Sequence, residues 1–195
     1  MIRFFGALCK ATLEHLSDES ACQSTADGFK RYSGRCPGCG AVGKLTSYGN
    51  YSRALVSYGS GKASDSRIFP LRFECSSCGK THALLAGNLV PYSPYSLRFM
   101  IIVLVAYFER ETTVHELCGQ FGIAVSTLYS WKRRLLEHKE LALGALLSLK
   151  TPALDFLKGL LKSDRISDYL SGFLGRFGFS FMQNRVTKAA QSHPP

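Results

Sequence analysis

The chain has 195 residues, which fits one or two domains, and 46% of them are hydrophobic, enough to bury a core and to exclude a disordered tail. Its formal net charge is +10 and its isoelectric point is about 9.4, which indicates a polyanion or an anionic surface as partner. Residues 29–98 carry most of this excess, with ten lysines and arginines against two acidic residues.

Residues 1–28 are predicted to be a separate N-terminal segment with a short helix around Ala11–Leu16. This segment lacks the apolar region and the cleavage site of a signal peptide. The longest apolar run in the chain, residues 99–108, is ten residues long, whereas a membrane span needs about 20. We therefore expect a cytoplasmic, nucleoid-associated protein that does not bind membranes.

Two Cys-x-x-Cys-Gly motifs stand out in residues 29–92, the second predicted unit. They are "RCPGCG" and "ECSSCG", and they contain Cys36, Cys39, Cys75 and Cys78. Four thiolates suit one tetrahedral Zn²⁺ ion without an open position, so the predicted cofactor is a single structural zinc per chain. The alternatives are a redox pair, which would need a βαβ unit that the sequence does not show, and two disulfides, which would need an oxidising compartment.

The long interval between the two motifs predicts a β-hairpin, and the whole unit is then a zinc ribbon. Residues 44–58 and 66–75 are rich in strand-forming side chains, and "GSGKASDS" between them is typical of a turn. Arg53 and Arg72 lie on the predicted strands, where we expect them to contact DNA phosphates. His82 is interpreted as a polar or core histidine, the alternatives being a fifth candidate ligand or a partner of the metal ligands.

Residues 93–141 change to a helical pattern. An apolar helix is expected after Pro94, and Thr113 with Glu116 forms a capping box that begins a second one. Gly122 is predicted to end that helix and Ser126 to be the N-cap of the next. Two helices joined by so short a turn indicate a helix-turn-helix, whose second helix enters the DNA major groove, although an ordinary helical hairpin is the simpler alternative.

The second helix of this pair has two predicted faces. Leu128, Trp131 and Leu135 share the face that packs inward, with Cys118 as a small residue where the helices approach. The predicted DNA contacts on the other side and its flanks are Ser126, Thr127, Tyr129, Ser130, Lys132, Arg133 and Arg134.

With these motifs the chain resembles a bacterial transposase-associated family, described as transposase-like or as a domain of unknown function. The resemblance covers roughly residues 36–135 and rests on the four cysteines, on "CGKTHALL" with "LVPY", and on the Leu117–Trp131 helix pair. The family pattern has proline after "THALL", whereas this chain has Ala86. The resemblance implies a module that recognises the terminal DNA of a mobile element.

Residues 142–186 are predicted to form helices beginning near Thr151–Pro152 and at Ser163, and residues 187–195 to be a disordered tail. A transposase of the carboxylate type needs three acidic residues on an α/β domain that holds two metal ions. Asp155, Asp164 and Asp168 instead fall on predicted helices, so we expect no catalytic residues and no enzyme activity.

The sequence thus predicts an α+β protein: a small β zinc ribbon, then an all-α helix-turn-helix domain and C-terminal helices. The favoured function is binding of double-stranded DNA, for transposon-end recognition or regulation. One alternative is a truncated or split transposase with a separate transposase or recombinase as catalytic partner. Another is a ribbon adapter that binds protein or RNA. A homodimer is compatible with each of them.

Overall fold

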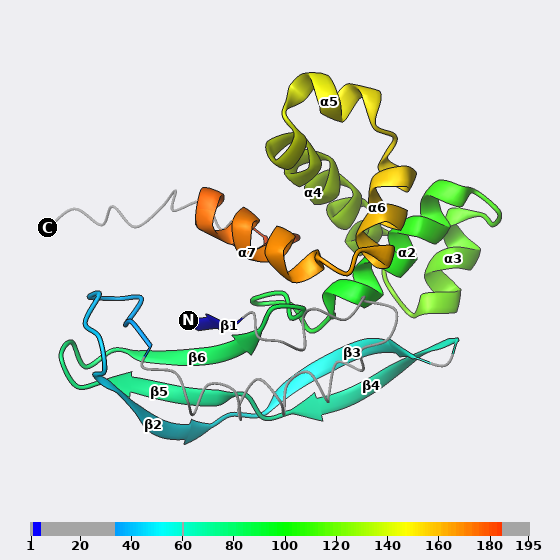
Figure 1. Cartoon of the computed structure of the whole chain (residues 1–195). Helices are drawn as coiled ribbons and strands as arrows, with labels where there is room; N and C mark the ends of the chain where they lie inside the picture. Colours follow the sequence, from blue (N-terminus) through cyan, green and yellow to red (C-terminus); the bar gives the residue numbers. More distant parts are fainter. Residues whose placement is uncertain (1, 5–33, 60, 185–195) are drawn as a thin grey trace, which may run out of the picture.

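The computed structural model describes residues 2–4, 34–59 and 61–184, in which β-strands precede helices (Figure 1). The predicted helix around residues 11–16 and the predicted tail at 187–195 lie outside these ranges. The strands are β1 (Ile2–Phe4), β2 (Leu45–Asn50), β3 (Arg53–Gly59), β4 (Lys62–Ile68), β5 (Leu71–Cys75) and β6 (Thr81–Ala86). The helices are α2 (Leu97–Glu109), α3 (Val114–Phe121), α4 (Val125–Leu143), α5 (Ala145–Lys150), α6 (Ala153–Lys162) and α7 (Ile166–Phe177).

The predicted hairpin is present and consists of two paired sections. Strand β2 pairs antiparallel with β5, and β3 pairs antiparallel with β4, so the same two chain segments run side by side along their length. Pro70 lies between the sections, where it has no N–H to donate, although its carbonyl accepts from the Tyr51 N–H at 3.3 Å. Gly59 pairs with Lys62, so residues 62–66 belong to β4 and the predicted long turn was wrong. The antiparallel register of β3 and β4 therefore already begins at the pair Gly59 and Lys62.

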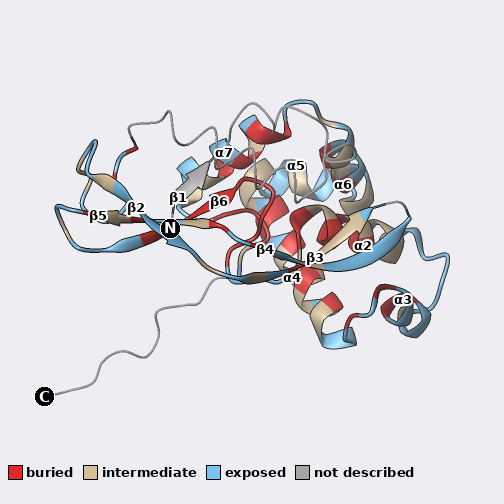
Figure 2. Ribbon diagram, turned by 90° about the horizontal axis from the view of Figure 1, so that it is seen from below, coloured by how far each residue is buried: buried red, intermediate tan, exposed pale blue. Residues whose placement is uncertain are grey.

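Strand β6 was not predicted from the sequence. It pairs antiparallel with β5 on one side and parallel with β1 on the other, giving the order β1-β6-β5-β2. Figure 2 shows that β6 and the segment after it are largely buried, whereas β4 is largely exposed. Strand β6 therefore forms the inner part of the ribbon.

The helical part has one large core. Helix α2 begins at the Ser96 N-cap, whose hydroxyl accepts from the Phe99 N–H, and most of its apolar run is buried. The Phe99 ring packs edge-to-face on Trp131 of α4, with ring centroids 6.1 Å apart. The apolar segment 99–108 is thus a core helix. In the described part of the chain no helix has both the length and the apolar character that crossing a membrane requires.

The helix boundaries confirm some predicted caps and correct others. Thr113 and Glu116 form the capping box of α3, and Gly122 ends that helix at φ 62°. The N-cap of α4 is Ala124, without a side-chain hydrogen bond, so Ser126 lies inside the helix and its predicted capping role was wrong. The extended backbone of Ala124 (φ −74°, ψ 146°) begins the helix two residues earlier.

Helices α5, α6 and α7 occupy the C-terminal part of the described chain. Helix α6 begins after Pro152, close to the predicted position. Ser163 is not the N-cap of α7, because that helix starts at Ile166; its hydroxyl instead accepts from the Arg165 N–H in the preceding turn, at 3.2 Å. Phe181 is buried among aromatic rings of α4, α6 and α7, so the aromatic segment after α7 packs on the helical core.

The ribbon is docked on the helices through β3. The Val56 N–H donates to the Pro94 carbonyl at 2.7 Å, and the Val56 carbonyl accepts from the Ser96 N–H at 3.0 Å. Arg98 of α2 also donates to the Tyr58 carbonyl at 2.6 Å. Both backbone groups of Val56 are therefore used to join the ribbon to the start of α2.

Candidate metal centre and nucleic-acid interface

Two turns of the same kind carry the four cysteines. In the first turn the Gly40 N–H donates to the Cys36 carbonyl at 2.9 Å, and in the second the Gly79 N–H donates to the Cys75 carbonyl at 2.8 Å. Gly40 and Gly79 have φ values of 77° and 66°, a region that glycine adopts at little cost. The glycine after each pair is therefore what closes the turn and directs both thiols to the same side.

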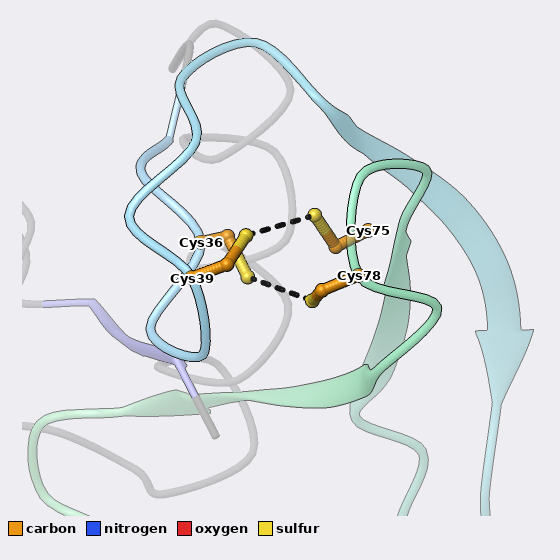
Figure 3. Close-up of side chains that lie close together, drawn as sticks. All are labelled: Cys36, Cys39, Cys75 and Cys78. Carbon is orange, nitrogen blue, oxygen red and sulfur yellow. Dashed lines mark hydrogen bonds between the residues drawn. The ribbon is translucent and has the colours of Figure 1, made fainter.

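The four sulfur atoms converge in the structure (Figure 3). All four lie within 4.8 Å of one another, with Cys36 and Cys78 separated by 3.8 Å and Cys39 and Cys75 by 3.7 Å. Sulfurs bound about 2.3 Å from one tetrahedral Zn²⁺ would lie about 3.8 Å apart, whereas a disulfide needs about 2.05 Å. The cluster can therefore hold a metal ion, and its geometry is compatible with zinc.

The thiols influence one another's ionisation. Burial raises the pKa of the Cys36 thiol, but hydrogen bonds from the backbone of Cys39 and Gly38 outweigh this and lower it to about 6. At Cys78 the backbone N–H of Lys80 lowers the pKa, but burial and the neighbouring thiols raise it to about 11. Several thiolates this close together repel one another unless a cation neutralises them. A divalent ion would supply that charge.

His82 lies directly beside the sulfur cluster. Its Nε2 atom is 3.3 Å from the Cys36 sulfur, and its side chain is buried on β6. His82 therefore hydrogen-bonds one of the four cysteines that could hold a metal ion. With four cysteines already present, an imidazole in this place orients a sulfur and adjusts its charge.

The helix pair α3–α4 has the predicted inward face. Leu128, Trp131 and Leu135 are at most 1% exposed, and Cys118 on α3 is buried near the turn. The Ile123 N–H donates to the Cys118 carbonyl at 3.0 Å, which closes the turn behind Gly122. Residues 122–124 are therefore a short, well-defined connection between the two helices.

The predicted DNA contacts on α4 fall into two groups. Ser126, Tyr129 and Arg133 are exposed, and Thr127 and Ser130 are half-buried. Arg133 has one weak partner, Glu137, at 3.9 Å, and both of these side chains are largely exposed. These side chains thus form an accessible face at the start and middle of the helix.

The remaining basic residues on α4 contact other parts of the protein. Lys132 donates to the Tyr107 hydroxyl at 2.9 Å and lies over the rings of Tyr107 and Tyr129. Arg134 donates to the Met182 carbonyl at 3.1 Å and to the Ser130 hydroxyl at 3.0 Å. Arg134 therefore ties the C-terminal segment to α4, a structural role that the sequence pattern did not indicate.

The two ribbon arginines also differ from each other. Arg53 donates to the carbonyls of Val90 and Ser93 at 2.6 and 2.5 Å, so its guanidinium holds the loop after β6. Arg72 is exposed and lies over the Tyr51 ring, 4.9 Å from its centroid. Of the two, Arg72 is the one whose charge faces solvent.

Comparison with known protein families gives a match over part of the chain. Residues 36–131 match the family described as a domain of unknown function, DUF6431. The match begins at Cys36 and ends at the buried Trp131, so it contains all four cysteines of the sulfur cluster, helix α3 and the first part of α4. No curated protein and no solved structure matches the chain.

Proposed function

We propose that this chain is a sequence-specific DNA-binding protein with a structural zinc ribbon and a helix-turn-helix. In this proposal it recognises transposon ends, or regulates them, without catalysis of its own. Helix α3, the turn at residues 122–124 and helix α4 have the length and connection that such a motif needs. This arrangement of α3 and α4 is compatible with DNA binding.

The single observation that carries the proposal is the division of α4 into two faces. Leu128 and Trp131 anchor one face in the core, while Ser126, Tyr129 and Arg133 remain accessible on the other. Base-contacting side chains of a recognition helix lie near its start, where Ser126 and Tyr129 are, and Arg133 follows one turn later. Arg133 can reach a guanine edge or a phosphate, and the hydroxyls of Ser126 and Tyr129 suit base edges.

The charge distribution supports a nucleic-acid partner. The excess of basic residues is concentrated in residues 29–98, which also contain the four clustered cysteines. Zn²⁺ held by Cys36, Cys39, Cys75 and Cys78 has a structural role here, because four thiolates leave no open position for substrate. Asp155, Asp164 and Asp168 are exposed on or beside the C-terminal helices, and Asp168 pairs with Arg165.

The decisive experiment is selection of bound duplexes from a random DNA pool with the zinc-loaded protein. We expect one enriched sequence, and an inverted repeat within it would indicate a homodimer. The variant Ser126→Ala/Arg133→Gln should remain folded, lose about 1–3 kcal/mol for each missing base contact and blur the preferred sequence. Lys150→Gln, at the exposed end of α5, removes a charge elsewhere and is the matched control.

Two results would contradict this proposal. Equal sequence preference in the α4 variant and the parent protein would show that this helix does not read bases. Tighter binding of RNA than of duplex DNA at equal salt would favour the adapter function. A neighbouring gene that encodes a domain with three catalytic carboxylates would favour the split transposase, whose DNA-binding part this chain would then be.

A further inference from the structure

A cleft of about 510 Å³ opens on the ribbon, and no residue of helix α4 lines it. It lies between β3, β5, β6 and the loop after β6. The residues that line it are Tyr51, Arg53, Ala54, Arg72, Thr81, Ala83, Leu85, Tyr92, Ser93 and Pro94. This volume is within the range of about 300–1,000 Å³ that is usual for small-molecule sites. Two tyrosines and two arginines line the cleft, and none of its lining residues is acidic.

Tyr92 is held in an unusual conformation at the rim of this cleft. Its backbone φ is 58°, a region that bulky residues seldom adopt, and its side chain is 84% exposed. The loop that carries it is fixed on either side of this residue, because Arg53 binds the carbonyls of Val90 and Ser93. An aromatic ring is thus kept in solvent by a backbone that costs energy to maintain, which is typical of binding sites.

Tyr51 and Arg72 provide aromatic and cationic groups in the same cleft. The Arg72 guanidinium lies 4.9 Å from the centroid of the Tyr51 ring and is otherwise exposed. Ala54, Ala83 and Leu85 add small apolar surface between these groups and Tyr92. Aromatic faces together with a free guanidinium match a flat, aromatic ligand that carries negative charge.

We propose that this cleft binds an unpaired nucleotide of a DNA strand, as found at a frayed or overhanging duplex end. The base stacks on Tyr92, and Arg72 contacts the adjoining phosphate. The inference rests on the proposed DNA-binding function and adds a second, sequence-independent contact to it. Arg53 is a positioning residue that holds the Tyr92 loop.

The test uses the zinc-loaded, full-length protein and a short single-stranded DNA with one 2-aminopurine, whose fluorescence is quenched when it stacks on an aromatic ring. We expect the protein to quench the probe. Tyr92→Ala should weaken binding by roughly 5- to 150-fold, the effect of losing one base stack, whereas Tyr92→Phe should bind as the parent does. Tyr48→Ala, an exposed tyrosine of the same ribbon outside the cleft, is the matched control and should change nothing.

A second measurement separates this site from recognition by α4. The duplex selected from the random pool is prepared with blunt ends and with a single-stranded overhang. Tyr92→Ala should bind the blunt duplex as the parent protein does, but should not gain affinity when the overhang is added. The α4 variant Ser126→Ala/Arg133→Gln should show the opposite pattern, so either site can fail without the other. Binding without quenching, or an unchanged affinity in a folded Tyr92→Ala protein, would overturn the proposal. Equal or tighter binding of an RNA of the same sequence would overturn the assignment to DNA.

Discussion

The Nε2 atom of His82 lies 3.3 Å from the Sγ atom of Cys36, although the two residues are 46 positions apart in the chain. The contact joins β6 to the first cysteine turn. We expect His82→Phe, which keeps a ring of similar size but cannot donate, to lower metal affinity about 10- to 100-fold. Competition with a chromophoric chelator measures this. An unchanged affinity would mean that the imidazole only fills space.

Removal of one ligand should have a larger effect. Structural zinc sites contribute about 10–16 kcal/mol of apparent binding energy at neutral pH, and this energy is coupled to folding. Cys75→Ser should therefore release the metal and unfold the ribbon, as measured by elemental analysis and circular dichroism. Cys22→Ser, which leaves Cys36, Cys39, Cys75 and Cys78 unchanged, should keep its zinc. A full zinc content in a Cys36/Cys75 double variant would refute the four-cysteine site.

Trp131 is expected to be a core anchor. It is 1% exposed and packs on Phe99 and Tyr95, with centroids 6.1 and 4.8 Å away. Trp131→Ala should cost about 3–5 kcal/mol of unfolding free energy, measured by denaturant titration. Trp131→Phe should cost less, because it keeps part of the aromatic contact. A loss below about 1 kcal/mol in the alanine variant would contradict the assignment.

Arg53 and Arg72 should respond differently to substitution. Arg53→Met leaves two carbonyl acceptors without their charged donor and should cost about 1.5–3 kcal/mol of stability. Arg72→Gln should leave the free energy of unfolding almost unchanged. It should reduce the slope of log DNA affinity against log salt concentration by about the amount that one phosphate contact contributes. Thermal melts and salt titrations of both variants check this. The opposite result would place Arg53 at the DNA and Arg72 in the fold.

Cys118 should be chemically inert in the folded protein. Burial raises the pKa of its thiol, so the reactive thiolate is scarce at neutral pH, and the side chain is only 5% exposed. We expect no alkylation of Cys118 by iodoacetamide at pH 7.5 until denaturant is added, as followed by peptide mass spectrometry. Rapid modification under native conditions would show that the contact between α3 and α4 opens readily.

Local sequence signals predicted much of this fold. The cysteine turns, the capping box of α3 and the apolar helix α2 each depend on residues that are neighbours in the chain. Strand β6 was missed because "THALLA" lacks the alternation of a half-buried strand; four of its six residues are buried. Ser126 resembled an N-cap by residue type alone, whereas the backbone of Ala124 determines where α4 begins.

Sequence patterns could not predict which groups the basic side chains contact. Arg134 binds the Met182 carbonyl 48 residues away, and Arg53 binds a carbonyl 40 residues away. A backbone carbonyl is present at every position, so no residue type marks the one that an arginine will contact. The sequence therefore located the charge on the ribbon and on α4, but only the fold separates the exposed cations from those with structural partners.

The hydrogen bonds made by the N–H and the carbonyl of Val56 have a consequence for any ligand that contacts both the ribbon and helix α4. Because β3 is hydrogen-bonded to the segment at the start of α2, the ribbon surface and the α4 surface keep a fixed separation and orientation. Binding at one surface then raises the effective concentration of ligand at the other without the entropy loss of a flexible tether. A ligand whose two contact regions have a different separation can therefore bind only one of the two surfaces at a time.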